Sequence, residues 1–206
     1  MNLQIEHKHY YTASEKPEIV EIPEASYVSI LGKGSPGTTI FYEKKKEIKK
    51  LLEELQNRYS ETEKSFTSAV VEIFYWYDEQ QTGFIDIGEF YTKADLDLLH
   101  YRIAIRIPDY VSDDEIREAA REAVTPRLAD AFERFNYTAG KSVQVLHLGP
   151  LAGELETLPL LQEFATGQGL KKSGMHHELH LVNFERGESQ AHLQTILRDP
   201  VSELMN

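Results

Sequence analysis

The sequence predicts an α+β fold in which two strand–helix–strand–strand modules form one curved antiparallel sheet. The strand-like run from Tyr27 to Leu31 leads through a Gly/Pro loop into a long amphipathic pattern and then into two further strands. The run from Ser142 to Leu146 begins the same order again. Because each helix can cover only one face of its strands, we expect modules related by pseudo-twofold symmetry, helices on one face of the sheet and a ligand groove on the other.

The chain of 206 residues is long enough for one large domain with a substantial core. We expect a single domain over 1–206, with module one at about 19–108, a linker helix at about 112–126 and module two at about 130–201. No window is apolar enough for a signal sequence or a membrane span. We therefore expect a cytoplasmic protein without membrane contact, present as a monomer or weak homodimer.

The composition excludes several classes of function. Lysine and arginine number 22 against 34 aspartates and glutamates, which gives a net charge of −12. Because nucleic-acid affinity comes mainly from basic side chains that displace counterions, we expect no nucleic-acid partner. The chain has no cysteine, so disulfides, thiolate catalysis and thiolate metal sites are excluded.

In the first module, the glycines and proline of residues 32–37 end the opening strand. Residues 68–77 alternate with both faces apolar, which is typical of a central strand covered on each side, and residues 101–107 predict another strand. The irregular segment 80–99 has a length and composition compatible with a flap over the groove. The predicted helix is marked by apolar residues at helical spacing, namely Phe41, Ile48, Leu51, Leu52, Leu55 and Tyr59.

Before the second module, Ser112 and Glu115 form the pattern of a capping box, which predicts the start of the linker helix. Residues 131–137 and 142–148 predict two strands that form a hairpin, and residues 192–197 predict the last strand. The second amphipathic helix is marked by Leu155, Leu158, Leu161 and Phe164.

The strand-like run around Glu178 is the most informative part of the chain. In a strand, His176, Glu178 and His180 share one face, while Leu179 and Leu181 lie on the other. A carboxylate between two imidazoles lies either on a wet outer surface or in a cavity. By parity, we expect the two leucines to pack under a helix, so that Glu178 and His180 face the groove.

Metal binding is the first chemistry to weigh, because His176, Glu178 and His180 are all competent zinc ligands. Neighbours at this spacing stand roughly 7 Å apart on a strand, so a further ligand would have to converge from elsewhere. The run is also one residue short of the helical His-Glu-x-x-His motif. We therefore predict no metal and no other cofactor.

Acid–base chemistry or cation binding fits these residues better. A carboxylate among aromatic rings attracts a cationic lipophilic ligand, and a carboxylate with a shifted pKa can move protons. Glu72 is a candidate second carboxylate in the same groove, with Phe74 and Trp76 on the same strand face and Tyr101 as a hydrogen-bond donor. The alternatives are a structural carboxylate for Glu72 and plain core packing for Phe74 and Trp76.

Several segments resemble a known family in their order and spacing. The most specific are residues 16–23 with 32–36, 105–111, 143–150, 176–179 and 197–201. Through them the chain is similar to the stand-alone GyrI-like small-molecule-binding proteins of bacteria, nearest the cyclopropanoid cyclopropyl hydrolase branch. The resemblance covers about residues 11–201.

The resemblance implies two modules around a ligand groove, with the glutamate that matches Glu178 at the bottom of the pocket, where relatives meet cationic aromatic drugs. The branch detoxifies cyclopropane-bearing DNA alkylators by opening the ring with water. It implies Glu178 and Glu72 as catalytic candidates. The chain departs from the branch at His180, which replaces a tyrosine, at Tyr75, which replaces the first of a tryptophan pair, and at Tyr101, which replaces a tryptophan.

The sequence thus favours a protein that binds lipophilic aromatic or cationic small molecules, with possible hydrolytic ring opening. The ligand-binding candidates are Phe74, Trp76, Tyr101, His176 and His180. The alternative is a non-enzymatic interaction protein that binds a macromolecular partner such as gyrase, for which the acidic composition suits a basic partner surface. No basic helix-turn-helix segment is present, which argues against a DNA-binding regulator.

Overall fold

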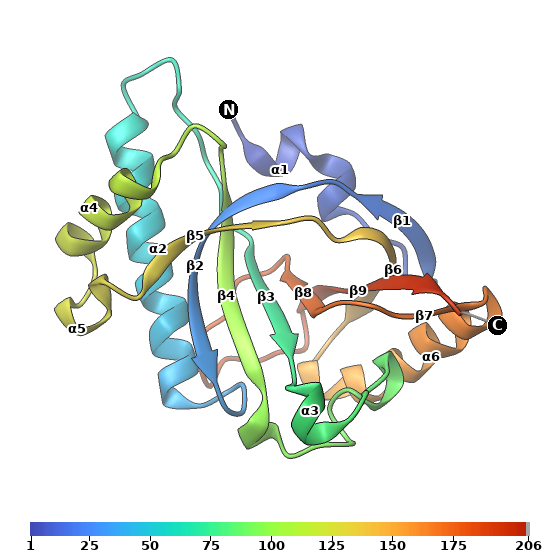
Figure 1. Cartoon of the computed structure of the whole chain (residues 1–206). Helices are drawn as coiled ribbons and strands as arrows, with labels where there is room; N and C mark the ends of the chain where they lie inside the picture. Colours follow the sequence, from blue (N-terminus) through green and yellow to red (C-terminus); the bar gives the residue numbers. More distant parts are fainter. Residues whose placement is uncertain (205–206) are drawn as a thin grey trace.

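The computed structural model describes residues 1–204 and has the predicted α+β fold, with a curved antiparallel sheet of nine strands in these residues (Figure 1). The strand order is β1-β6-β9-β8-β3-β4-β2-β5, and β7 pairs with β9. The strands are β1 (Glu18–Ile22), β2 (Ala25–Lys33), β3 (Val71–Trp76), β4 (His100–Ile107), β5 (Phe132–Tyr137), β6 (Gly140–Leu148), β7 (Leu170–Lys172), β8 (His176–His180) and β9 (Gln194–Glu203).

Two long helices, one from each half of the chain, pack on the sheet, and the helix that links the halves packs beside the first (Figure 1). None of the helices in residues 1–204 is long and apolar enough to cross a membrane. The helices are α1 (Leu3–Glu6), α2 (Thr39–Tyr59), α3 (Glu79–Thr82), α4 (Asp113–Ala123), α5 (Pro126–Ala129) and α6 (Glu154–Gly167).

Local sequence signals explain where the helices begin. Thr38 accepts a hydrogen bond from the backbone N–H of Phe41 and so caps α2. The predicted capping box of α4 is confirmed, because Ser112 caps the backbone of Glu115 while the Glu115 side chain caps Ser112. A side-chain cap satisfies backbone donors that would otherwise be unpaired at the helix start.

Strand pairing departs from the prediction in one place. The runs expected to form a hairpin are strands, but that pairing is wrong, because β5 pairs with β2 while β6 pairs with β1 and β9. The order β2-α2-β3-β4 is followed along the chain by β6-α6-β8-β9, with β3 and β8 adjacent in the centre of the sheet. The symmetry of the modules and their exact limits stay predictions.

The two faces of the sheet differ in what covers them. On one face, α2 and α6 bury the main core, in which Ile48 and Leu161 belong to the same cluster as Ile73 and Ile103. The opposite face is covered in part by the N-terminal segment, because Tyr10 and Tyr11 pack against it and are buried. We call these the helix face and the back face.

Gly32 in β2 is required by a close contact on the helix face. It pairs with Tyr101 of β4, and an ideal Cβ at Gly32 would lie 2.1 Å from Cζ of that ring. The Tyr101 ring is buried against Phe41, with ring centroids 5.1 Å apart, so it has little room to move away.

We expect Gly32→Ala to lower the free energy of unfolding by about 1–3 kcal/mol, because the added methyl group overpacks this contact. The measurement is urea unfolding. Gly167→Ala is the matched control, since a Cβ at Gly167 meets nothing within 4 Å. Equal stability of the two variants would contradict the role given to Tyr101.

Candidate functional site

The register between β3 and β8 decides which side chains can meet. Ile73 lies opposite Glu178, and Phe74 lies opposite His177. Because opposed residues of an antiparallel pair share a face, Glu178 lies on the helix face with Ile73. Glu72 lies opposite Leu179, so this carboxylate points to the back face.

The expectation of one groove shared by Glu72 and Glu178 is therefore wrong, and so is the face assigned to Glu178. Leu179 does not pack under a helix; it lies in the back-face cluster with Tyr10, Tyr11 and Ile196. The physical reason is that an apolar strand face can be covered by any apolar segment, and here the N-terminal segment covers it. The helices cover the face that carries Glu178.

Glu178 is the centre of a buried polar cluster and is only 2% exposed. The Tyr91 hydroxyl donates a hydrogen bond to Oε1 of Glu178. Nε2 of His180 lies 3.0 Å from Oε2, and Nε2 of His176 lies 3.6 Å from Oε1. Tyr91 comes from the irregular segment after α3, so part of that segment covers Glu178 on the helix face, whereas it was expected to close over a groove on the open face.

A line of alternating charges continues from this cluster into the next strands. Nδ1 of His176 lies 2.8 Å from Oδ2 of Asp199 in β9. Nζ of Lys172 in β7 lies 3.5 Å from Oδ1 of the same aspartate, and also 4.0 Å from the centroid of the Phe90 ring. Buried charges are tolerated when they are paired in this way.

The pKa shifts follow from this arrangement. Burial lowers the pKa of His176, but the charges of Asp199 and Glu178 outweigh it and raise that pKa to about 9. Burial raises the pKa of Glu178, but the imidazoles of His176 and His180 outweigh it and hold the pKa well below its usual range. At neutral pH, His176 is therefore a cation and Glu178 a carboxylate.

Glu154, the first residue of α6, has the opposite ionisation. Burial and then the charge of Glu178 raise the pKa of Glu154 well above its usual range, which favours the protonated form of this side chain. Burial lowers the pKa of His180, which is therefore neutral. The site thus holds a carboxylate, a carboxylic acid, a phenol and a neutral imidazole close together.

Aromatic and aliphatic groups enclose these polar atoms. The Tyr91 ring lies 5.9 Å from the His176 ring and 6.1 Å from the Tyr75 ring. On the α2 side, Nζ of Lys45 lies 3.9 Å from the centroid of Phe184. Burial lowers the pKa of Lys45 to about 8. Aromatic rings therefore surround the polar atoms of the cluster.

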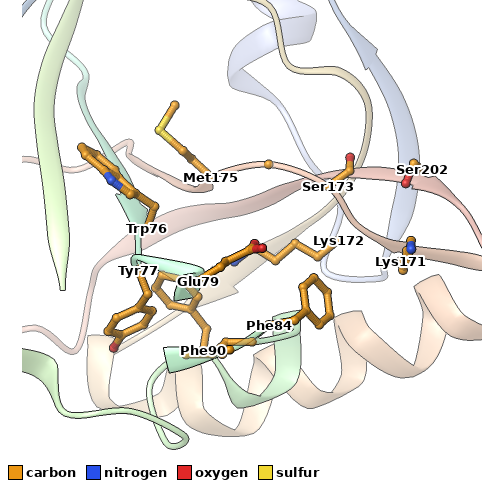
Figure 2. A pocket seen from close by; sticks show the side chains of 13 residues that line it. Trp76, Tyr77, Glu79, Phe84, Phe90, Lys171, Lys172, Ser173, Met175 and Ser202 are labelled. Carbon is orange, nitrogen blue, oxygen red and sulfur yellow. The ribbon is translucent and has the colours of Figure 1, made fainter. Parts of the chain in front are cut away.

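A cavity of about 470 Å³ lies next to the cluster, lined by Trp76, Tyr77, Phe84, Phe90, Lys172 and Met175 among others. Figure 2 shows these side chains around the cavity, with Trp76 and Met175 on one side and Phe90 and Lys172 on the other. The Phe90 ring also lies 4.8 Å from the His176 ring. Phe90 therefore contacts both the cavity and the cluster around Glu178.

The other residues predicted for the site lie apart from Glu178. Trp76 lines the cavity, and its ring stacks on His100. Tyr101 is on the helix face, two strands away from β8. Phe74 is on the back face, where its ring stacks on His177 with centroids 4.0 Å apart.

Glu72 is held in a buried hydrogen-bonded group on the back face. Tyr10 and Tyr11 donate to it at 2.6 and 3.2 Å, and Nε2 of His177 lies 2.9 Å away. The structure therefore brings Glu178, His176 and His180 together and leaves Glu72 and Phe74 in a different environment. The catalytic and binding roles of all these residues stay predictions.

Sequence reasoning missed Tyr91, Glu154, Asp199 and Lys45. Tyr91 lies in an irregular segment, and Glu154 begins a helix, where an acidic residue is favourable without being buried. Asp199 carried a usable signal, because it stands beside Arg198 between the apolar pairs Ile196–Leu197 and Pro200–Val201. In residues 1–204, no three or more His, Cys, Asp or Glu side chains are arranged to hold a metal ion.

Solved structures provide the comparison with known proteins. An uncharacterized conserved protein from Listeria innocua is 24% identical, with a TM-score of 0.80 over 98% of this chain and 100% of that one. A hydrolase from Listeria innocua is 23% identical, with a TM-score of 0.77 over the same shares. The C-terminal domain of EcmrR is 13% identical, with a TM-score of 0.54 over 91% of this chain and 98% of that one.

This chain has the fold of those proteins. The architecture is consistent with the GyrI-like fold that the sequence resemblance implies. No protein-family model matches the chain, and no curated protein sequence matches it. At these identities the likeness concerns the fold alone.

The pKa of His176 predicts a loss of stability at alkaline pH. The folded-state pKa of about 9 lies above the ordinary value of 6.5. The contribution of His176 to the free energy of unfolding is therefore complete below about pH 6.5 and is lost as the pH rises through 9. We expect this contribution to be on the order of 3 kcal/mol. Urea unfolding across this pH range measures it.

Imidazole NMR separates His176 from His177 and His180, whose pKa values burial lowers. We expect one buried histidine to titrate near pH 9 and to lose this behaviour in Asp199→Asn. Titration of all three buried imidazoles below pH 6.5 would contradict the ion pair with Asp199.

Proposed function

We propose that this protein binds small lipophilic molecules over Glu178 and hydrolyses strained electrophiles among them, of the kind that carry a cyclopropane. The observation that carries the proposal is the buried Glu178 carboxylate in contact with the His180 imidazole and the Tyr91 phenol, near Glu154, whose pKa burial raises. Such a set supplies both a proton acceptor and a proton donor at pH 7.

Because His176 already balances the charge of Glu178, proton transfer is a better role for this carboxylate than binding a cationic ligand. His176 is a cation 3.6 Å from Glu178, so the carboxylate is already compensated. A cationic ligand would have to compete with that pair. We therefore place neutral or weakly polar aromatic molecules first among the ligands.

His180 is the proposed acceptor of the water proton. Glu178 is ionised and can only accept, so His180 donates its Nε2 proton to it and keeps Nδ1 free of a proton. Nδ1 is buried and has no hydrogen-bond partner among residues 1–204. Glu178 then fixes the tautomer of His180 and stabilises the imidazolium that forms, as a carboxylate does for a catalytic histidine.

The reaction balances with these groups. The water oxygen bonds to a ring carbon of the cyclopropane while the adjacent carbon–carbon bond breaks. The electron pair of that bond moves into the conjugated carbonyl, whose oxygen takes a proton from Glu154, while Tyr91, whose pKa burial raises well above its usual value, keeps its proton. His180 takes the proton that water loses, and donors placed at the developing oxyanion lower the barrier.

Access requires the segment between α3 and β4 to move, because Tyr91 and Phe90 cover Glu178 and His176. The cavity lined by Trp76 is the proposed entrance, since Phe90 is shared by both spaces. Gating by such a segment also keeps bulk water from the reacting atoms. The hydrolase from Listeria innocua, which has this fold, adds support for hydrolytic chemistry.

We expect wild-type protein to add one water to a cyclopropane-bearing DNA alkylator, and Glu178→Gln to slow this by about a hundredfold or more, because the amide cannot orient His180 in the same way. Mass spectrometry of the compound in normal and oxygen-18 water measures the reaction. Incorporation of oxygen-18 identifies water as the nucleophile.

Glu72→Gln is the matched control for that experiment, because Glu72 is an equally buried glutamate on the back face. It should keep most of the activity, provided that circular dichroism shows a folded chain. Activity that is lost in Glu72→Gln and kept in Glu178→Gln would reject the assignment of the site.

Trp76 gives an independent test of the entrance, because it is the single tryptophan of the chain. We expect an aromatic ligand to quench its fluorescence with a saturating dependence on concentration, since the ring lines the cavity. N-acetyltryptophanamide is the control. A linear response equal to that of this free indole would speak against the entrance.

A further inference from the structure

A second cavity of about 380 Å³ lies on the back face, between the N-terminal segment and β1. Its walls include Tyr10, Val20, Ile22, Pro23 and Arg106. It shares no lining residue with the cavity of Figure 2. It plays no part in the function proposed above.

Arg106 is the unusual feature of this cavity. The side chain is about nine-tenths buried, with 8% of the residue exposed, and it makes no hydrogen bond or ion pair with any residue in 1–204. Its neighbour on the same strand face, Arg102, lies 2.6 Å from Glu133 and 2.7 Å from Ser29. Arg198 is buried too, and donates to Gln144 and to the carbonyl of Tyr10.

The contact that Arg106 does make leaves its hydrogen-bond donors free. Its guanidinium carbon lies 5.0 Å from the centroid of the Tyr10 ring, and that of Arg198 lies 4.6 Å from the same centroid. The ring supports a planar guanidinium through cation–π attraction. No carboxylate of residues 1–204 pairs with Arg106, although the chain carries a net charge of −12, and the guanidinium lines the cavity with its donors unused by the protein.

We propose that this cavity binds a small organic carboxylate, with the Arg106 guanidinium as its anchor. The planar fork of arginine donors matches the two oxygens of a carboxylate. The apolar body of the ligand would lie against Val20, Ile22 and Pro23. These apolar walls favour an organic anion over inorganic phosphate, which has no group to bury there.

The charged residues at the rim nearly cancel. Glu6 and Glu21 line the cavity together with Lys8 and the imidazoles of His7 and His9, and all but His7 are exposed. Exposed charges interact weakly across water. The buried guanidinium therefore dominates the polarity of the inner part of the cavity.

The experiment is calorimetric titration of the full chain with 1-naphthoate, with inorganic phosphate as the comparison anion. We expect saturable naphthoate binding that is weakened by about tenfold or more in Arg106→Gln, because the charge and the fork are lost. Arg102→Gln is the matched control and should bind as the wild type does. Arg106→Lys keeps the charge but loses the fork, and should also bind more weakly.

Glu178→Gln separates this site from the one proposed for hydrolysis, and it should leave naphthoate binding unchanged. NMR should show shifts at Val20 and Ile22. The proposal is overturned if wild type does not bind naphthoate, if Arg106→Gln binds it equally well, or if phosphate binds as tightly as naphthoate does.

Discussion

The pairing of β3 with β8 is the constraint on which both faces of the sheet depend. A shift of one residue would move every side chain of β8 to the other face. It would carry Glu178 in among the back-face aromatic rings and place Leu179 against Lys45 and Glu154. The observed register is supported on both faces, by the Tyr75 ring stacked on His176 on one and by Glu72 bonded to His177 on the other.

Several buried ionisable groups of the helix face occur in pairs for an energetic reason. An unpaired buried ion costs several kcal/mol, whereas opposite charges in contact recover much of that cost. Lys172, Asp199, His176 and Glu178 follow one another with alternating sign. Glu154 has no cation left to pair with, so it keeps its proton. Arg198 is also buried without an anion, but Gln144 and the Tyr10 carbonyl accept its hydrogen bonds, whereas Arg106 has no acceptor among residues 1–204.

The sequence was enough to predict the main helices and strands, but it did not show which face of the sheet the helices cover. Apolar spacing predicted α2 and α6, and alternation predicted the strands, because these patterns reflect local geometry. The alternation also placed His176, Glu178 and His180 together, because alternate residues of a strand share a face whatever the rest of the fold is. The sequence could not show which face of the sheet the helices cover. Leu179 requires only an apolar cover, and Tyr10 lies in a polar segment that gives no sign of providing it.

Contacts made by residues distant in sequence were the other limit. Tyr91 reaches Glu178 across 87 positions, and nothing local to either residue marks that contact. Glu154 looks like an ordinary first-turn acid. Such residues become recognisable only when the sheet has brought them together, whereas Asp199 could have been singled out as a charge inside a buried strand.

The topology also determines when the fold can be completed during synthesis. Arg198 donates to the carbonyl of Tyr10, 188 positions earlier, and β9 lies between β6 and β8. Until β9 has been synthesised and released from the ribosome tunnel, a nascent chain therefore has an open gap in the sheet between β6 and β8. Because closing long loops is slow and leaves strand edges exposed, such a chain depends on rapid release or on chaperone protection until β9 arrives.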